Sequence, residues 1–310
     1  MSIVFAGTPR NAAVTLRELL NAGTPITLVL TRPDAPVGRK SVLTPSEVAA
    51  VADEFGIPVL KTNNLREPEL KLLANGTYDF AIVVAFGVIL RSTALSTLPK
   101  GWFNLHYSLL PRWRGAAPVQ HALIAGDSDT GVSLFQIDEG LDTGALIAQV
   151  PTTIQPNENA GQLLERLTHL GISLLLQEIP GISSGLAKLE PQSESGVTLA
   201  PKLDRRDGYL DVHTEADYAY ARFRGVTPEP GCWTEFKDQT IKLLDVQPAK
   251  DTVLAGLVTL IDGRIVLGLA KGSLELLSVQ PAGKTTMSAA DWFRGQQASE
   301  VRLGKHDERS

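Results

Sequence analysis

The sequence predicts an α/β domain with a mostly parallel sheet, followed by a small β-barrel domain. Short apolar strands alternate with amphipathic helices over the N-terminal part of the chain. A segment poor in large apolar residues comes next, and five short strands without intervening helices lie beyond it. The 310 residues are 43% hydrophobic and 20% charged, which is enough apolar material for two packed domains.

In the first half, alternating patterns define the expected elements. The nearly continuous apolar run Phe80–Ala85 is typical of a strand that is buried on both faces of a sheet. The full set of expected strands is Ser2–Ala6, Ile26–Leu30, Val59–Leu60, Phe80–Ala85, Trp102–His106 and Val132–Ile137. The expected helices are Asn11–Leu20, Ser46–Phe55, Glu67–Leu73, Pro118–Leu123 and Asn159–Glu178. Strands that alternate with helices predict βαβ units around a mostly parallel sheet.

In the second half the pattern changes. Residues 179–202 are rich in Gly, Ser, Pro and Gln, which indicates a linker. After a helix at Thr214–Phe223, strands are expected at Trp233–Phe236, Ile241–Val246, Gly256–Ile261, Arg264–Gly268 and Leu274–Val279. This succession predicts a small barrel of the oligonucleotide-binding type. We therefore divide the chain into domains at 1–180 and 206–310, joined by a linker at 181–205, with a frayed tail after Gly304.

Composition excludes several classes of protein. The single cysteine, Cys232, excludes an internal disulfide and any zinc site with two cysteines. No leader pattern and no apolar run of about 18 residues are found, so we expect a cytoplasmic protein without a membrane span. The net charge of −5 argues against a nonspecific nucleic-acid coat. However, residues 80–126 carry four basic side chains (Arg91, Lys100, Arg112 and Arg114) and no carboxylate, which indicates an anionic ligand there.

Two polar segments carry the candidate chemistry. Asn104 and His106 are two residues apart on an expected strand, so both side chains lie on one face. At a strand end, an amide and an imidazole can stabilise a carbonyl oxygen and move a proton. Asp142 lies in a glycine-flanked loop that can bring its carboxylate to His106. The alternatives are a hydrogen-bonded core histidine and an aspartate that caps a turn.

Other kinds of site have weaker support. The turn Phe5–Pro9 follows a strand and opens a helix, but it lacks the Gly-x-Gly-x-x-Gly of a dinucleotide site. The remaining histidines (His121, His169, His213 and His306) are scattered, and no metal site is expected.

At this point several motifs resemble one family. They are Phe-Ala-Gly-Thr-Pro at 5–9, Arg-Pro-Asp-x-Pro-x-Gly-Arg at 32–39, Asn-x-His-x-Ser-Leu-Leu-Pro-Arg-Trp-Arg-Gly-Ala-Ala-Pro at 104–118, Gly-Leu-Asp-Thr-Gly at 140–144, and Gln-Pro-Ala-Gly-Lys-x-x-Met-Ser-Ala at 280–289. The sequence resembles the methionyl-tRNA formyltransferases nearly end to end. The resemblance implies a Rossmann-like formyltransferase domain and a C-terminal oligonucleotide-binding-type barrel that contacts tRNA.

The resemblance also implies an activity and its residues. The formyl group of 10-formyltetrahydrofolate, a co-substrate, would pass to the α-amine of methionyl initiator tRNA in translation initiation. Asn104, His106 and Asp142 would be the catalytic trio, and Arg39 and Lys40 would contact tRNA. The folate site would be lined by Ser108, Leu109, Leu110 and Pro111. We expect a monomer without a metal.

The sequence departs from the family pattern in two places. Only Lys40 follows Arg39 in a loop that often carries several lysines. The C-terminal domain, commonly basic, has 13 Lys/Arg and 15 Asp/Glu over residues 206–310. Its candidate tRNA contacts are Arg222, Arg224, Lys242, Lys271 and Lys284.

Three alternative functions remain open: a formyltransferase for a nucleotide amino sugar, a formyltetrahydrofolate hydrolase, and an RNA-binding adaptor. The adaptor would leave Asn104, His106 and Asp142 unexplained. The sequence also leaves open whether His106 acts as a protonated donor or as a neutral proton relay.

Overall fold

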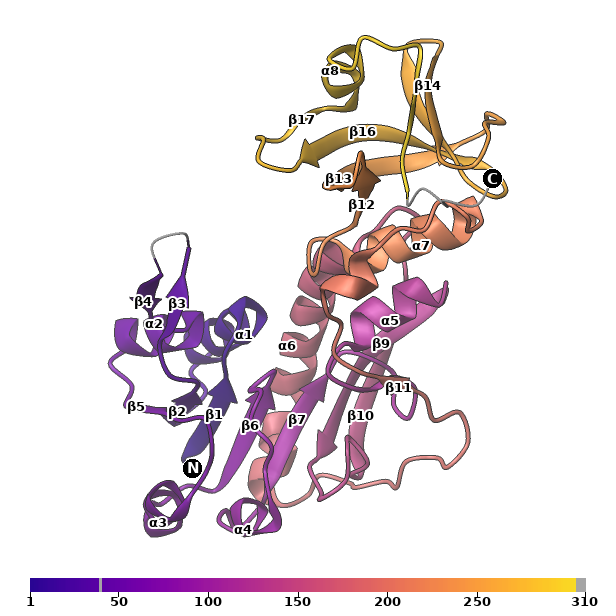
Figure 1. Ribbon diagram of the computed structural model, residues 1–310. Coiled ribbons are helices and arrows are strands. Elements are labelled where there is room, and N and C mark those ends of the chain that lie inside the picture. The colour runs from indigo at the N-terminus through magenta and orange to yellow at the C-terminus, as the bar shows by residue number, and fades with distance from the viewer. Residues whose placement is uncertain (39–40, 305–310) are drawn as a thin grey trace. The chain divides into compact units, whose positions relative to one another are not determined.

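The structure is a computed structural model that describes residues 1–38 and 41–304 (Figure 1). Its backbone contacts divide the chain into two compact units. The first consists of Met1–Pro118, Asp129–Thr153 and Leu164–Ala200. The second consists of Val119–Ser128, Ile154–Leu163 and the residues from Pro201 onward. The expected frayed tail after Gly304 lies outside the described residues.

The first unit is built on a seven-stranded sheet with the order β10-β9-β7-β6-β1-β2-β5. Its strands are β1 (Ile3–Gly7), β2 (Ile26–Thr31), β5 (Val59–Lys61), β6 (Phe80–Val84), β7 (Trp102–His106), β9 (Asp129–Gln136) and β10 (Leu146–Thr153). The five neighbouring strands β7, β6, β1, β2 and β5 are parallel to one another. In contrast, β9 is antiparallel to β7, and β10 is antiparallel to β9. The predicted mostly parallel sheet is therefore confirmed.

Five helices belong mainly to this unit: α1 (Arg10–Asn21), α2 (Glu47–Glu54), α3 (Glu67–Asn75), α4 (Ser92–Leu95) and α6 (Ala160–Ser184). On one face of the sheet, alternate residues such as Val4 of β1 and Val83 of β6 form a core cluster with Leu73 of α3 and Ala94 of α4. Figure 1 shows α6 running alongside β6 and β7. Burial of β1 and β6 on both faces explains their continuous apolar sequences.

Three features of the first unit were not expected from the sequence. The edge strand β10 contains Pro151, and proline is tolerated at a sheet edge although it weakens a strand pattern. Strands β3 (Ala35–Val37) and β4 (Val42–Thr44) pair with each other as an antiparallel hairpin. A short parallel pair joins β8 (Arg114–Gly115) to β11 (Leu199–Ala200).

The segment at 181–205 begins as helix. α6 continues through Pro180 to Ser184, because Ile179 and Ile182 extend its buried stripe. The residues that follow make backbone hydrogen bonds within the first unit. Glu190 and Leu146 exchange two of them, and the Thr198 carbonyl oxygen accepts one from the Arg114 amide. Residues up to Ala200 are therefore fastened to the first unit, and the chain passes to the second unit at Pro201.

The second unit contains an antiparallel sheet with the order β12-β13-β16-β15-β14-β18. The strands are β12 (Trp233–Phe236), β13 (Gln239–Ala249), β14 (Leu257–Ile261), β15 (Arg264–Gly268), β16 (Ser273–Pro281) and β18 (Glu300–Arg302), with β17 (Met287–Ser288) paired to β16. The amide of Gly304 donates to the carbonyl oxygen of Glu235, which links the end of β18 to β12, the other edge of the sheet. This hydrogen bond brings the two edges of the sheet together, in keeping with the expected barrel.

Helices complete the second unit. These are α5 (Pro118–Ile124), α7 (Ala216–Val226), α8 (Ala289–Arg294) and the 3₁₀ helix η1 (Arg205–Gly208). Phe223 of α7 and Trp292 of α8 belong to the buried core of the sheet, and Ile124 of α5 packs against it. Within the part of the chain that the structure describes, none of the helices combines the length and apolar character that crossing a bilayer requires.

Candidate active site

Asn104 and His106 project from one face of β7, as their spacing predicts. Phe135 of β9 lies opposite Asn104 in the sheet, and its ring meets the His106 ring edge-on at 6.4 Å. Asn104 is half-buried, and no hydrogen bond among the described residues involves its side chain. His106 is only 5% exposed. The site thus contains an enclosed imidazole and an amide that is available to a ligand.

The hydrogen bonds of His106 define its chemistry. The imidazole Nε2 lies 2.9 Å from the carbonyl oxygen of Trp113. A carbonyl oxygen only accepts hydrogen bonds, so Nε2 carries the hydrogen of the neutral ring. Nδ1 lies 3.8 Å from Oδ2 of Asp142. A proton is therefore gained or lost at Nδ1, which faces the carboxylate.

Two opposing effects act on the pKa of His106. Burial lowers the pKa from its ordinary value, because an imidazolium is poorly solvated inside the protein. The Asp142 carboxylate and the Trp113 carbonyl oppose this effect, since both favour the protonated ring. Burial is the larger influence, and the net shift is downward. At neutral pH the imidazole is accordingly in its neutral form, with Nδ1 able to accept a proton.

Asp142 reaches His106 from a loop that turns back along the sheet. β9 is antiparallel to β7 and ends with Gln136 opposite Phe103, three residues below His106. The loop that follows β9 must therefore return by roughly 10 Å to place the carboxylate beside the imidazole. Asp142 itself has a left-handed backbone, with φ of 51°. A Cβ at Gly144 would overlap the carbonyl oxygen of Gln136, so only glycine allows this close return.

The segment after β7 covers the imidazole. Trp113 has a left-handed backbone with φ of 62°, and its amide donates to Oγ1 of Thr198 at 2.8 Å. The amide of Gly115 donates to Oδ2 of Asp142 at 2.8 Å. Gly115 has φ of 127°, and a Cβ there would lie 2.6 Å from the carbonyl oxygen of Ala200. Left-handed non-glycine residues cost free energy, and the candidate site holds two of them, Trp113 and Asp142.

The predicted folate-lining segment is largely turned into the protein. Ser108 and Leu110 are 1% and 4% exposed, whereas Leu109 and Pro111 are half-buried. Ser133 accepts a hydrogen bond from the Leu110 amide, and its own hydroxyl donates to the Ser108 carbonyl oxygen. Only Leu109 and Pro111 therefore offer appreciable side-chain surface, and the role of this segment stays a prediction.

A second segment borders the site at the point where the strand order reverses. β1 and β6 are neighbours in the sheet, and ligands of open α/β sheets bind beyond the carboxyl ends of such strands. Residues 85–90 follow β6, and the hydroxyl of Thr8 beyond β1 donates to the carbonyl oxygen of Phe86. Ile89 in this segment is 88% exposed. Sequence reasoning passed over these residues because they form no motif of titratable side chains.

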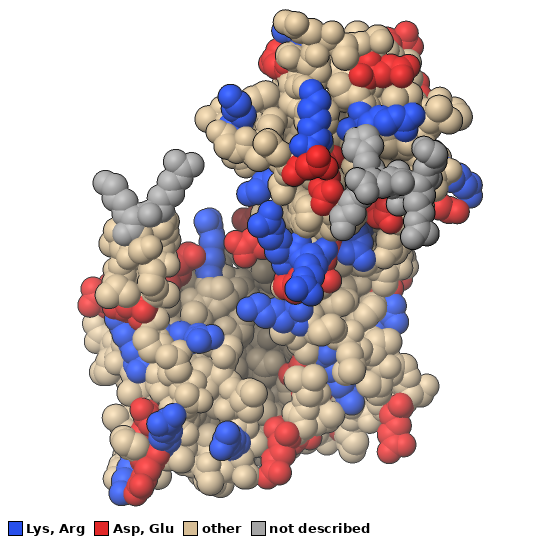
Figure 2. All heavy atoms as spheres, viewed as in Figure 1, with Lys and Arg blue, Asp and Glu red and all other residues tan. Residues whose placement is uncertain are grey.

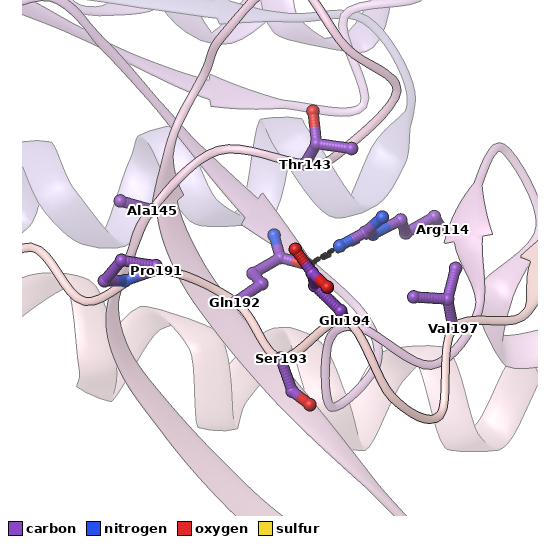
Figure 3. A pocket seen from close by; sticks show the side chains of 8 residues that line it. All are labelled: Arg114, Thr143, Ala145, Pro191, Gln192, Ser193, Glu194 and Val197. Carbon is purple, nitrogen blue, oxygen red and sulfur yellow. Dashed lines mark hydrogen bonds between the residues drawn. The ribbon is translucent and has the colours of Figure 1, made fainter.

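Gln192 is a site residue that sequence reasoning missed. Its Nε2 donates to the carbonyl oxygens of Asp142 and Gly144, both at 2.8 Å. Its Oε1 accepts from Nε and Nη2 of Arg114, at 3.1 and 2.7 Å. Figure 3 shows Arg114 and Gln192 pointing toward each other beside a hollow of about 490 Å³. The residue lies in the segment expected to be a linker, where nothing in the sequence marks it.

The basic residues near the site have separate roles. Lys100 binds Asp79 and the carbonyl oxygen of Ser183, so it is held in a structural ion pair. Arg112 lies 4.6 Å from the Trp113 ring. Arg39 and Lys40, the predicted tRNA contacts, lie outside the described residues. Among the residues that the structure does describe, no cluster of three His, Cys, Asp or Glu side chains can hold a metal ion.

Comparison with known families matches both halves of the chain. Residues 1–179 match the family described as formyl transferase, and residues 202–297 match the formyl transferase C-terminal domain. The methionyl-tRNA formyltransferase of Leifsonia xyli subsp. xyli is 47% identical over 296 residues, which are 95% of this chain and 97% of the relative. That of Streptomyces coelicolor is 43% identical over 304 residues, covering 97% of this chain and 98% of the relative.

Solved structures share the fold at low identity. The N-formyltransferase from Helicobacter canadensis, in complex with folinic acid and dTDP-3-aminofucose, has a TM-score of 0.69 and 16% identity, covering 90% of this chain and 98% of that one. HypX from Aquifex aeolicus in complex with tetrahydrofolic acid has a TM-score of 0.63 and 14% identity, covering 94% of this chain and 46% of that one. At these identities the likeness concerns the fold.

Proposed function

Because this chain belongs to the methionyl-tRNA formyltransferase family, we propose that it transfers a formyl group from 10-formyltetrahydrofolate to the α-amine of methionyl initiator tRNA. The observation that carries the proposal is the arrangement of Asn104, His106 and Asp142. It joins an amide without a partner among the described residues, a neutral imidazole, and a carboxylate 3.8 Å from that imidazole. This set meets the needs of acyl transfer to an amine, which are an oxyanion donor and a proton acceptor.

The chemistry distributes over these three side chains. The α-amine attacks the formyl carbon, and a C–N bond forms while the carbonyl oxygen becomes an oxyanion. The Asn104 amide donates to this oxygen. The bond from the formyl carbon to N10 of the folate then breaks, and the proton lost by the amine ends on N10. His106 moves that proton at Nδ1, while Nε2 stays tied to the Trp113 carbonyl. Asp142 stabilises the imidazolium that forms transiently.

Asp142 has one carboxylate oxygen that is available for a part in the reaction. One carboxylate oxygen, Oδ2, accepts from the Gly115 amide and faces Nδ1 of His106. No hydrogen bond among the described residues involves the other oxygen, Oδ1, and the side chain is 18% exposed. Asp142 is thus anchored through Oδ2, and Oδ1 can accept from the attacking amine or from a bridging water. We place the folate beside Asn104, along the carboxyl end of β6 and the half-buried residues Leu109 and Pro111.

A comparison of acceptors tests the function. Purified protein is incubated with 10-formyltetrahydrofolate and, in separate reactions, with methionyl initiator tRNA, a nucleotide amino sugar, or water alone. We expect formyl transfer to the tRNA only. Transfer to the sugar would replace the proposal with a sugar formyltransferase, and folate hydrolysis without an acceptor would replace it with a hydrolase. No turnover with any acceptor would favour a binding protein.

A surface of the second unit supports tRNA as the partner. Arg205 of η1 lies over the Trp233 ring at 5.4 Å, and Arg222 of α7 lies over Tyr218 at 5.5 Å. With Arg206, these residues form what we call the η1–α7 surface, which borders a hollow of about 410 Å³. In Figure 2, Lys and Arg side chains lie among Asp and Glu side chains over the second unit on the face shown. Arginines interleaved with aromatic rings are typical of surfaces that bind nucleic acid.

The η1–α7 surface includes only some of the basic residues of the second unit that the sequence offered as tRNA contacts. Of the basic residues considered from the sequence, Arg222 belongs to it. Lys271 instead lies 3.7 Å from the Glu215 carboxylate, and Arg224 donates to the Glu158 carbonyl oxygen. A local surface of this kind can bind phosphates although residues 206–310 are acidic overall.

In the first unit, we propose that Arg39 and Lys40 and the neighbouring strands β3 and β4 contact tRNA. Arg39 and Lys40 fall between these strands in the sequence. The hairpin exposes Val37, Val42 and Leu43 by 57%, 58% and 68%, although β3 and β4 are paired to each other. Exposed apolar side chains beside basic residues suit the unpaired bases at the end of an acceptor arm. We further propose that the protein acts as a monomer in the cytoplasm, where initiation takes place.

A further inference from the structure

We propose that Gln192 is a positioning residue for formyl transfer: its amide ties the Asp142 loop to Arg114 and so fixes the carboxylate beside His106. The inference rests on the proposed function, because it assigns Gln192 a part in that reaction. The hydrogen bonds of Gln192 go to backbone carbonyls and to Arg114 rather than to the three catalytic side chains. It acts through the backbone of Asp142 and through the segment that covers the imidazole.

The amide of Gln192 is fully used. Its two N–H groups donate to two different carbonyl oxygens of the Asp142 loop, those of Asp142 and Gly144. Its oxygen accepts two hydrogen bonds from one guanidinium, that of Arg114. Four hydrogen bonds exhaust what a glutamine side chain can make. Such a complete set fixes the orientation of the amide, so the distance between the loop and Arg114 is also fixed.

The backbone on either side of Gln192 is anchored to the same two regions. Glu190 exchanges two backbone hydrogen bonds with Leu146, just after the Asp142 loop. The Thr198 carbonyl oxygen accepts from the Arg114 amide, and the Thr198 hydroxyl accepts from the Trp113 amide. The stretch 190–200 thus forms a strap between the loop that carries Asp142 and the segment that covers His106. Gln192 is the side chain of this strap that joins them.

The left-handed backbone of Asp142 explains why the tie matters. A non-glycine residue with φ of 51° is held in this sparsely populated conformation by its surroundings. The hydrogen bond from Gln192 to the Asp142 carbonyl oxygen is one of the contacts that hold it. Without that bond, the Gly115 amide alone holds the Asp142 carboxylate, and the peptide can shift toward a more favourable conformation. The carboxylate would then leave Nδ1 of His106, and proton transfer would slow while substrate binding would persist.

Two substitutions and a control test the proposal. Gln192→Glu keeps an acceptor for Arg114 but places a carboxylate against two carbonyl oxygens that need donors. Gln192→Met keeps the length of the side chain and removes all four hydrogen bonds. The control is Ser193→Ala, because Ser193 is exposed and its hydroxyl accepts from the nearby Ser195 amide. Each variant is assayed for kcat and for the KM of both substrates, and its melting temperature is compared with wild type.

We expect both Gln192 variants to lose about 10- to 100-fold in kcat, the scale of a misplaced catalytic group, with both KM values within about twofold of wild type. Ser193→Ala should match wild type. Wild-type kcat in Gln192→Glu would overturn the proposal, because the donors to the two carbonyl oxygens would then be dispensable. A parallel rise in both KM values with a large drop in melting temperature would also overturn it, since it would indicate a general structural role.

A second measurement separates this proposal from the proposed function. Titration of the His106 imidazole by NMR shows whether the Asp142 carboxylate lies close to it, because Asp142 raises the pKa of His106. In Gln192→Met this pKa should fall below the wild-type value. An unchanged pKa would overturn the positioning role even if kcat fell. If the wild-type protein formylates no acceptor, the proposed function fails, whereas the titration still decides whether Gln192 places the carboxylate.

Discussion

The polar residues around His106 and those of the expected tRNA-binding surfaces are organised in opposite ways. At the candidate site, His106 is 5% exposed and its Nε2 is hydrogen-bonded to the Trp113 carbonyl oxygen, while Gln192 joins the Asp142 loop to Arg114. On the β3–β4 hairpin, Val37, Val42 and Leu43 are more than half exposed and contact solvent. On the η1–α7 surface, arginines lie over aromatic rings rather than in buried networks.

The difference follows from what each region has to do. Proton transfer requires groups that are held within a fraction of an ångström before the substrate arrives. Binding of a long polyanion instead adds up many exposed contacts, none of which has to be held rigidly. We therefore expect single substitutions at the site to have large effects on kcat. Substitutions on the two surfaces should have smaller effects, confined to tRNA and dependent on salt.

The largest effect is expected for Asn104→Ala. The Asn104 amide is half-buried and has no hydrogen-bond partner among the described residues, so its loss should leave the fold intact. Removal of one oxyanion donor typically lowers kcat by about 10²–10³. Steady-state kinetics with methionyl initiator tRNA measure this loss. A kcat near the wild-type value would show that Asn104 takes no part in catalysis. It would also contradict the expectation that substitutions at the site lower kcat more than substitutions on the tRNA-binding surfaces do.

A smaller effect is expected for Arg39→Ala. The planar guanidinium of an arginine can contact phosphates or base edges of the acceptor arm, and Arg39 falls in the sequence between β3 and β4. Its loss should lower kcat/KM for charged tRNA by about 1–3 kcal/mol and leave the KM for the folate unchanged. Arg66→Ala is the matched control, because Arg66 is an exposed arginine of the same unit. Identical kinetics in both variants would exclude Arg39 from the tRNA interface.

The pH dependence should show the buried character of the site. Burial lowers the pKa of His106, and the neutral ring is the form that accepts a proton at Nδ1. The kcat should therefore be level above this pKa and fall about tenfold per pH unit below it. In Asp142→Asn the inflection should move to lower pH, since the carboxylate raises the pKa of His106. A rate that falls as the pH rises would show instead that the imidazolium is required.

The smallest effect is expected on the η1–α7 surface. The double variant Arg205→Ala/Arg206→Ala should raise the KM for tRNA only a few-fold at low salt. The more specific signature is the salt dependence, which should flatten by about one unit of log–log slope for each phosphate that the variant no longer neutralises. Arg294→Ala serves as control, because Arg294 pairs with Asp291 elsewhere in the second unit. If the double variant and the control have the same slope, this surface does not bind tRNA.

Sequence patterns predicted the fold well where burial was uniform. The continuous apolar runs of β1 and β6 indicated strands in the centre of a parallel sheet, and both strands are there. β10 was missed because Pro151 interrupts its pattern, which only an edge strand tolerates. The helix α6 extends beyond its expected end because Ile179 and Ile182 continue its buried stripe, although Pro180 is typical of a helix end.

The candidate site was predicted only in part. The two-residue spacing of Asn104 and His106 and the glycines around Asp142 carried enough information to indicate three residues that the structure brings together. The burial of His106 and the part of Gln192 depend on contacts between segments far apart in the chain. Gln192 is 50 residues from Asp142 and 78 from Arg114, and no local pattern reports such contacts. Ser108 and Leu110, which were predicted to line the folate site, are buried, and their contact with the folate stays a prediction.

The discontinuous composition of the two units has a consequence for biosynthesis. The second unit takes residues 119–128 from the middle of the first and completes its sheet only with β18, at residues 300–302. Ile124 packs against its core, and Gly225 of α7 leaves space for that side chain. On the ribosome, α5 therefore emerges about 180 residues before the strand that completes its own unit. A gene fragment that starts at Pro201 would encode a second unit with an open gap in place of α5.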